Sequence, residues 1–170
     1  MQATLHTSLG PVRVVLDPAR APRTVASFVA HARAGFYDGT LFHRVVPGFV
    51  IQGGGYGPGL APRRVPECPL PNEADNGLSN RRGTLAMART GEPHSATTQF
   101  FVNLADNTFL DHREPTPEGW GYCVFGHVVE GMEVVDRIGA VPTGLRGGHR
   151  DVPLEDVLLE RVELHDRAPA

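Results

Sequence analysis

Short apolar runs broken by turn-forming residues constrain the fold of this chain more than any other feature of its sequence. The 170 residues include 20 glycines and 15 prolines. Residues 3–16 form two alternating runs on either side of Ser8-Leu9-Gly10-Pro11, which is typical of a β-hairpin. Further strands are predicted at residues 84–88, 100–104, 122–129 and 157–164. So many short strands with turn signals between them favour a mainly antiparallel sheet.

Two segments show helical periodicity instead. Small and apolar residues recur at helical spacing from Pro22 until Gly35, and a shorter run at residues 131–138 repeats the pattern. Between the strands, residues 53–82 are rich in Gly, Pro and Asn and predict a long irregular segment, which is usually functional or packed against the body of a domain. We therefore predict a single domain over residues 1–170, a closed antiparallel sheet plugged at its ends by two helices.

Composition limits the class of protein and its partners. A hydrophobic fraction of 41% with 21% charged residues is that of a soluble globular protein. The net charge of -3 disfavours nucleic acid and anionic membranes, which both reward a concentrated basic surface. Residues 1–10 lack the basic and apolar regions of a signal peptide. Since Cys68 and Cys123 form no CxxC pair and suit a reducing compartment, we expect a cytoplasmic protein.

The stretch LFHRVVPGFVIQGGG, residues 41–55, predicts a half-buried hairpin that turns at Pro47-Gly48 and carries two polar residues, Arg44 and Gln52. Alternation places Gln52 on the same face of the second strand as Val50. One face of the first strand is predicted to carry Phe42, Arg44 and Val46. Taken alone, Arg44 also fits a surface ion pair. Gln52 and Gln99 could equally form hydrogen bonds with backbone groups near residues 53–55.

Other chemistries find less support in the sequence. The eight histidines are scattered without HExxH or paired ligand spacing, so we expect neither a metal nor a cofactor. GGGYGPG at residues 53–59 matches neither GxGxxG nor a P-loop. Ser95 follows His94 but lacks a GxSxG elbow. His43 should face away from Arg44, as a hydrogen-bonded core residue rather than a base.

Three longer stretches carry a resemblance to a known family. FHRVVPGFVIQGG (42–54), NEADNGLSNRRGTLAMART (72–90) and SATTQFFVNL (95–104) resemble the cyclophilin-type peptidyl-prolyl isomerases. Met-Ala-Arg-Thr at 87–90 and GWGYCVF at 119–125 are similar to the bacterial cytoplasmic branch. The resemblance runs from about residue 3 to residue 164 with order and spacing preserved. It implies an eight-stranded antiparallel β-barrel with two helices, an active groove outside the sheet, and isomerisation of X-Pro bonds.

The resemblance also implies the site residues. The family's catalytic arginine and glutamine fall on Arg44 and Gln52, with Phe49 beside them. The apolar pocket for the proline ring is expected at Phe49, Val50, Phe101 and Leu110, and Tyr122 lines the groove. Residues before the proline should meet Met87, Ala88, Arg89, Thr90 and Gln99. Phe109 is also expected to line the groove, at a position where many eukaryotic members have tryptophan, which implies weak cyclosporin binding.

The chemistry of the X-Pro bond makes sense of this assignment. Rotation has a barrier of roughly 18–20 kcal/mol and takes tens to hundreds of seconds without a catalyst. Reaching milliseconds needs about five powers of ten, or roughly 7 kcal/mol. An apolar pocket can hold the ring while an arginine stabilises the nitrogen lone pair that appears when the amide twists. The expected partners are proline-containing peptides and unfolded or partly folded proteins, bound by a monomer.

Two alternatives stay open at the level of sequence. The same groove could belong to a proline-motif binding module or chaperone that does not catalyse rotation. Arg44 favours catalysis, because binding through an apolar pocket does not require a cation. The four pocket residues could also be plain core, and Tyr122 could be structural.

Overall fold

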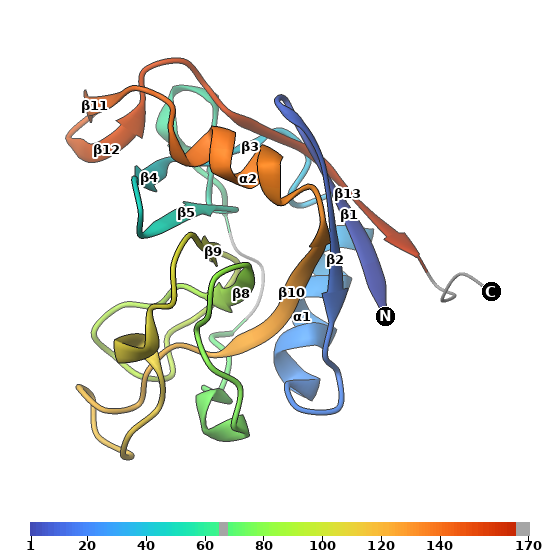
Figure 1. Cartoon of the computed structure of the whole chain (residues 1–170), viewed down its shortest axis with the longest axis vertical. Coiled ribbons are helices and arrows are strands. Elements are labelled where there is room, and N and C mark those ends of the chain that lie inside the picture. Colours follow the sequence, from blue (N-terminus) through green and yellow to red (C-terminus); the bar gives the residue numbers. More distant parts are fainter. Residues whose placement is uncertain (65–67, 166–170) are drawn as a thin grey trace.

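A computed structural model describes residues 1–64 and 68–165 of the chain. Within these residues the backbone forms a nine-stranded antiparallel sheet in the order β3-β13-β1-β2-β10-β8-β9-β5-β4 (Figure 1). Its strands are β1 (Gln2–Thr7), β2 (Gly10–Leu16), β3 (Thr40–Leu41), β4 (Arg44–Val46), β5 (Val50–Gly53), β8 (Thr84–Met87), β9 (Phe100–Asn103), β10 (Val124–Glu130) and β13 (Leu158–His165). The predicted mainly-β, antiparallel fold is confirmed.

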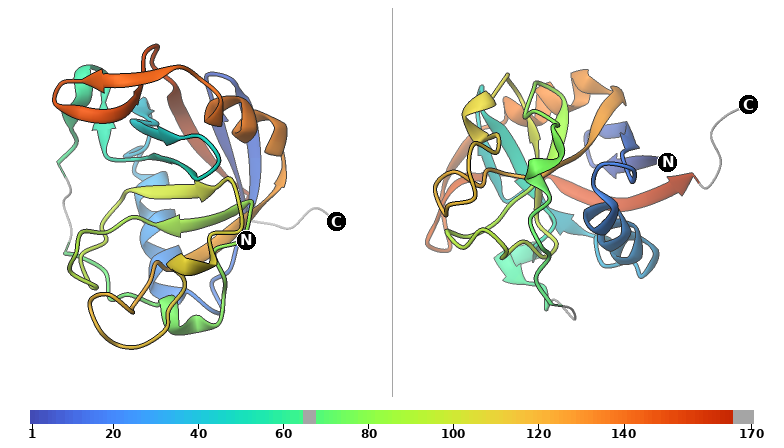
Figure 2. Two further views of the ribbon diagram at one scale, coloured as in Figure 1. Left: turned by 60° about the vertical axis from the view of Figure 1, so that its left-hand side comes forward. Right: turned by 90° about the horizontal axis from the view of Figure 1, so that it is seen from below.

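The sheet curls strongly, but its two edge strands do not pair with each other. Only Phe42 and His43 separate β3 from β4 along the chain, so the ends of the sheet meet through continuous backbone (Figure 2). In the described part of the chain, no hydrogen-bonded ladder joins these two strands. The predicted closed, eight-stranded barrel therefore differs from the structure in strand count and in closure.

Two helices, α1 (Pro22–Arg33) and α2 (Met132–Gly139), lie at opposite ends of the curled sheet (Figure 1). Both were predicted, and α1 begins at Pro22 as expected. Its buried side chains include Val25, Phe28, Val29 and Ala32, which recur at helical spacing on one face. The Phe28 ring packs on Phe100 of the sheet at 5.7 Å between centroids. Among the described residues, no helix is long and apolar enough to cross a membrane.

Several short elements were not predicted. A second hairpin joins β11 (Thr143–Arg146) to β12 (His149–Pro153), and β12 packs beside β4. The segment predicted to be irregular contains β6 (Tyr56–Gly57), β7 (Ala61–Pro62) and two 3-10 turns, η1 (Pro58–Leu60) and η2 (Ala74–Asn76). Residues 65–67 of that segment lie outside the described residues. A third turn, η3, spans Thr108–Leu110.

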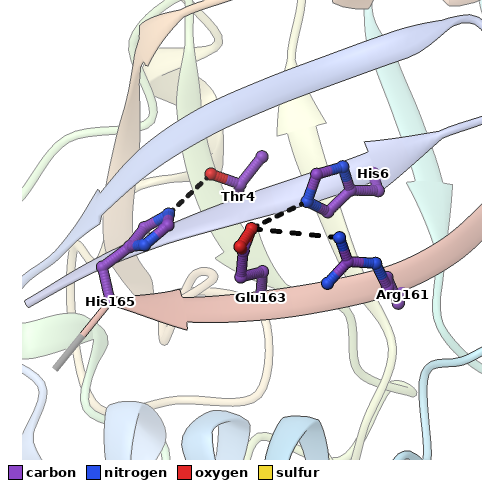
Figure 3. A network of polar contacts seen from close by, with 5 residues as sticks. All are labelled: Thr4, His6, Arg161, Glu163 and His165. Atoms are coloured by element: carbon purple, nitrogen blue, oxygen red, sulfur yellow. Dashed lines mark hydrogen bonds and ion pairs between the residues drawn. The ribbon is translucent and has the colours of Figure 1, made fainter.

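The outer face of β1 and β13 is polar (Figure 3). His6 contacts Glu163 at 3.1 Å between Nε2 and Oε1, and Thr4 contacts His165 at 2.8 Å. The period-two alternation of a regular strand changes phase in β13, because the pairing with β1 skips Glu160. This bulge lets both Leu159 and Val162 point into the core.

Candidate active site

The β4–β5 hairpin places Arg44 directly opposite Gln52. The register pairs Arg44 with Gln52 and Val46 with Val50, while Val45 and Ile51 between them enter the main core. Arg44 Nη1 donates a hydrogen bond to Gln52 Oε1 at 3.2 Å. The predicted turn is confirmed, since Gly48 has a φ of 72° and Phe49 N donates to Val46 O. Strand pairing therefore fixes the two polar residues side by side.

Phe42 does not share the face of Arg44 as predicted. The strand predicted here breaks after Leu41 and restarts at Arg44, so the period-two alternation does not continue across Phe42 and His43. Phe42 is 2% exposed and packs edge-on against Phe100 in the main core.

A separate apolar cluster lies on the face of the sheet that carries Arg44. It consists of the buried residues Val50, Ala86, Phe101 and Val124, with Phe49, Leu78, Ala88, Leu110 and Tyr122 packed against them. Their strand neighbours Ile51, Leu85 and Val102 point the other way, into the main core. The sheet thus has apolar residues on both faces, and only one face carries the main core.

This cluster surrounds a cavity of about 320 Å³, which we name the apolar cavity. Its lining is Arg44, Phe49, Val50, Gln52, Ala88, Arg89, Phe101, Leu110 and Tyr122. The rings of Phe101 and Tyr122 meet edge to face at 5.8 Å. The structure therefore brings together the predicted arginine, the predicted glutamine and all four predicted pocket residues.

A second cavity of about 220 Å³, the polar cavity, continues the groove. It shares Gln52, Ala88 and Arg89 with the apolar cavity and adds Thr90, Ser95, Thr97 and Gln99. Gln52 Nε2 donates to Gln99 Oε1 at 3.1 Å, so the chain Arg44–Gln52–Gln99 runs from one cavity to the other. Ser95 and Thr97 were not predicted, although both lie in the stretch that carried the resemblance.

Two predicted groove residues occupy other places. Met87 is 4% exposed and belongs to the main core, because it alternates on β8 with Ala86, which faces the apolar cluster. Phe109 is 67% exposed and stacks on Phe49 with 5.8 Å between ring centroids. Phe109 is thus a rim residue, whereas the prediction of Met87 in the groove is wrong.

Arg89 lines both cavities. Its Nε donates to Gly121 O at 2.9 Å and its Nη1 donates to Thr90 O at 2.9 Å. The guanidinium carbon lies 4.6 Å from the centroid of the Tyr122 ring. A cation held over an aromatic face is stabilised by the ring quadrupole. Arg89 and Tyr122 therefore support each other as one wall of the groove.

Two features surround Arg44: it has no acidic ion-pair partner among the described residues, and the buried ring of His43 precedes it in the chain. Among the described residues, no carboxylate lies within ion-pair distance of Arg44. His43 is 6% exposed, and its ring packs in a tilted arrangement against Tyr56 with 4.5 Å between centroids. Burial, reinforced by the charges of His149 and Arg44, lowers the pKa of His43 from 6.5 to about 4.

The predicted burial of His43 is confirmed, but the predicted hydrogen bond of its ring is not found among the described residues. Nδ1 of His43 is buried and has no partner in the part of the chain that the structure describes. Within the same residues, no group of three or more His, Cys, Asp or Glu side chains is arranged to hold a metal ion.

Comparisons with known proteins give matches over nearly the whole chain. A family model described as cyclophilin type peptidyl-prolyl cis-trans isomerase/CLD matches residues 2–164. The chain is 53% identical over 163 residues to peptidyl-prolyl cis-trans isomerase B of Escherichia coli K12, covering 96% of this chain and 99% of that protein. It is 52% identical over 160 residues to an isomerase of Streptomyces antibioticus, covering 94% and 96%.

The fold has a close counterpart among solved structures. A cyclophilin-type isomerase of Cryptosporidium parvum, crystallised in the presence of the dipeptide Ala-Pro, superposes with a TM-score of 0.83 at 24% identity. The match covers 98% of this chain and 100% of the other. The family model and the bacterial relatives show that the chain belongs to the cyclophilin-type peptidyl-prolyl cis-trans isomerases.

Proposed function

We propose that the apolar cavity holds the proline ring of an X-Pro segment and that Arg44 accelerates rotation of the bond before it. The observation that carries this proposal is the half-buried Arg44 at an apolar cavity, hydrogen-bonded to Gln52 and without an ion-paired carboxylate among the residues that the structure describes. A cation in such surroundings interacts more strongly with developing charge than it would in water. The substrates are proline-containing peptides and partly folded chains.

The reaction needs stabilisation of a twisted amide and no proton transfer. Twisting the X-Pro bond localises the lone pair on the prolyl nitrogen. A hydrogen bond donated by a guanidinium N–H to that nitrogen is therefore stronger in the twisted state than in the planar state. Phe49, Val50, Phe101 and Leu110 hold the ring still while the acyl group turns. Gln52 accepts from Arg44 and thereby orients it. The residues before the proline lie over Ala88 and Arg89 toward the polar cavity.

The decisive experiment measures isomerisation of an Ala-Pro-Phe peptide by exchange NMR, comparing the wild type with Arg44→Ala. Removing one preorganised donor costs about 10²–10³ in kcat at comparable sites, and we expect a loss of that order. Peptide affinity should be retained, because the apolar cavity keeps its walls. Arg13→Ala is the matched control, since Arg13 is half-exposed and pairs with Glu130 elsewhere on the sheet.

The outcome also separates catalysis from recognition. Binding of the peptide by the wild type without turnover would leave the groove as a site for proline motifs and contradict the proposal. An unchanged kcat in Arg44→Ala would remove this residue from the mechanism.

We further propose a monomeric protein of the cytoplasm that binds cyclosporin weakly. The thiols of Cys68 and Cys123 are free, which suits a reducing compartment. Phe109, stacked on Phe49 at the rim, has no side-chain hydrogen-bond donor to offer such a ligand.

A further inference from the structure

We infer that three buried asparagines, Asn80, Asn103 and Asn107, are positioning residues that set the separation of the walls of the apolar cavity. The inference rests on the proposed role of this cavity as the site for the proline ring. It assigns a function to residues that line neither cavity and touch no substrate.

The three side chains form one continuous chain of hydrogen bonds, the asparagine ladder. Asn107 Nδ2 donates to Asn103 Oδ1 at 2.9 Å, and Asn103 Nδ2 donates to Asn80 Oδ1 at 3.1 Å. The second N–H of Asn103 reaches Thr84 Oγ1 at 2.9 Å. Asn80 and Asn103 are 0% exposed and Asn107 is 5% exposed. Buried carboxamides satisfied in this way hold a defined geometry, because any displacement leaves a polar group unpaired.

The ladder ends on the backbone of the cavity walls. At one end, Asn107 Nδ2 donates to Phe49 O at 3.0 Å. At the other end, Asn80 Nδ2 donates to Tyr122 O at 3.2 Å. The main-chain oxygen of Asn107 accepts from Leu110 N at 2.9 Å. Each of three wall residues from separate segments is thus bonded to a member of the ladder.

These walls have little regular structure of their own to hold them. Phe49 lies in the β4–β5 turn, Leu110 ends η3, and Tyr122 precedes β10. Dispersion contacts with a bound ring weaken steeply when a wall moves by 0.5–1 Å. Arg44 and Gln52, in contrast, are fixed by strand pairing. The ladder therefore governs how tightly the ring is held, more than how well the twisted bond is stabilised.

The test is Asn107→Asp, which keeps the shape of the side chain. A carboxylate at this position donates nothing and faces two acceptors, Phe49 O and Asn103 Oδ1. We expect KM and the peptide Kd to rise about tenfold at pH 7.5, equivalent to one lost hydrogen bond, with kcat within about twofold. Below pH 5, protonation of the new carboxyl returns one donor, so KM should fall back toward the wild-type value.

Thr40→Val is the matched control. Thr40 is 0% exposed, and its Oγ1 donates to Tyr37 O at 2.8 Å, away from both cavities. This variant should lose stability as a ladder variant does, with KM and Kd unchanged. If Asn107→Asp also lowers Tm without moving KM or Kd, the ladder is only structural and the inference is overturned.

A milder variant guards against failure to fold. Asn107→Ala leaves Phe49 O with its second donor, Leu104 N at 2.8 Å, and should show the same rise in Kd. Because Kd is measured without turnover, the ladder can be judged even if the wild type binds peptide and fails to isomerise it. An unchanged Kd in both Asn107 variants would reject the ladder and leave the proposed function standing.

Discussion

Gly55 lacks a side chain at the point where Gln99 crosses the backbone. A Cβ added to Gly55 would lie 2.5 Å from Gln99 Cγ and 2.6 Å from Gln99 Nε2. Gln99 in turn accepts from Gln52, which holds Arg44. The side chains of Gln99 and Gln52 therefore connect the backbone at Gly55 to the guanidinium of Arg44. The alignment of Arg44, the proposed catalytic cation, therefore depends on the absence of a side chain at Gly55.

Gly55→Ala should therefore reduce activity more than stability. The added methyl displaces Gln99, whose side chain is flexible and half-buried, so we expect a change in unfolding free energy below about 1 kcal/mol. Loss of the Gln99–Gln52 bond loosens Arg44, and kcat should fall by up to about tenfold, since small misplacements of catalytic groups are costly. Steady-state kinetics measures the change in kcat, and urea unfolding measures the change in unfolding free energy. Gly91→Ala, where nothing lies within 4 Å, is the control.

Between elements, His43 is covered by the β6 segment and by the β11–β12 hairpin. Its ring packs against Tyr56 in a tilted arrangement, and the centroid of the His149 ring lies 6.5 Å away. Burial holds the pKa of His43 at about 4, with His149 and Arg44 acting in the same direction. Between pH 6.5 and 4 the unfolded chain binds a proton that the folded protein excludes. Stability therefore falls as the pH falls through this window, by roughly 3 kcal/mol in total for this residue.

Replacing His43 by Gln should flatten that dependence. Urea unfolding from pH 7 to pH 4 should show a loss of stability smaller than in the wild type by roughly 3 kcal/mol, while the exposed His127→Gln keeps the wild-type slope. Isomerisation by the wild type should be nearly constant from pH 6 to 8, because the proposed mechanism transfers no proton and the pKa of His43 lies at about 4. A step in kcat near pH 6.5 would mean that a histidine takes part in the reaction.

Elements with a strong periodic pattern could be predicted from the sequence, and those held by tertiary contacts could not. Residues 3–16, both helices and the β4–β5 turn were predicted because alternation, helical spacing or Pro-Gly marked each of them. The β11–β12 hairpin was missed, since its exposed residues and the glycines 147 and 148 give no apolar alternation. Met87 was misplaced because resemblance gives a position in the chain, whereas the pleat of β8 decides the face. The ladder connects residues from three segments that show no pattern in common.

At the scale of the whole molecule, the curled sheet depends on a close crossing where its two ends meet. Gly53 at the end of β5 lies against the backbone that joins β3 to β4. A Cβ on Gly53 would be 2.6 Å from Leu41 O and 3.1 Å from Phe42 Cα. Both neighbours are backbone atoms, and Phe42 N is itself bonded to Val157 O at 2.9 Å. The junction can therefore relax only by moving strands.

Gly53→Ala should accordingly destabilise the fold much more than Gly55→Ala does two residues later. We expect a loss of about 3 kcal/mol in unfolding free energy, the upper range for overpacking against a rigid neighbour. Gly53 has no positive φ, so a loss of unfolding free energy would come from the close approach of the new Cβ to the β3–β4 backbone and not from backbone strain. Urea unfolding of the two variants side by side measures the difference. Equal stabilities would show that the junction yields as easily as the Gln99 side chain, and curvature would then have to be ascribed to the helices that cap the sheet.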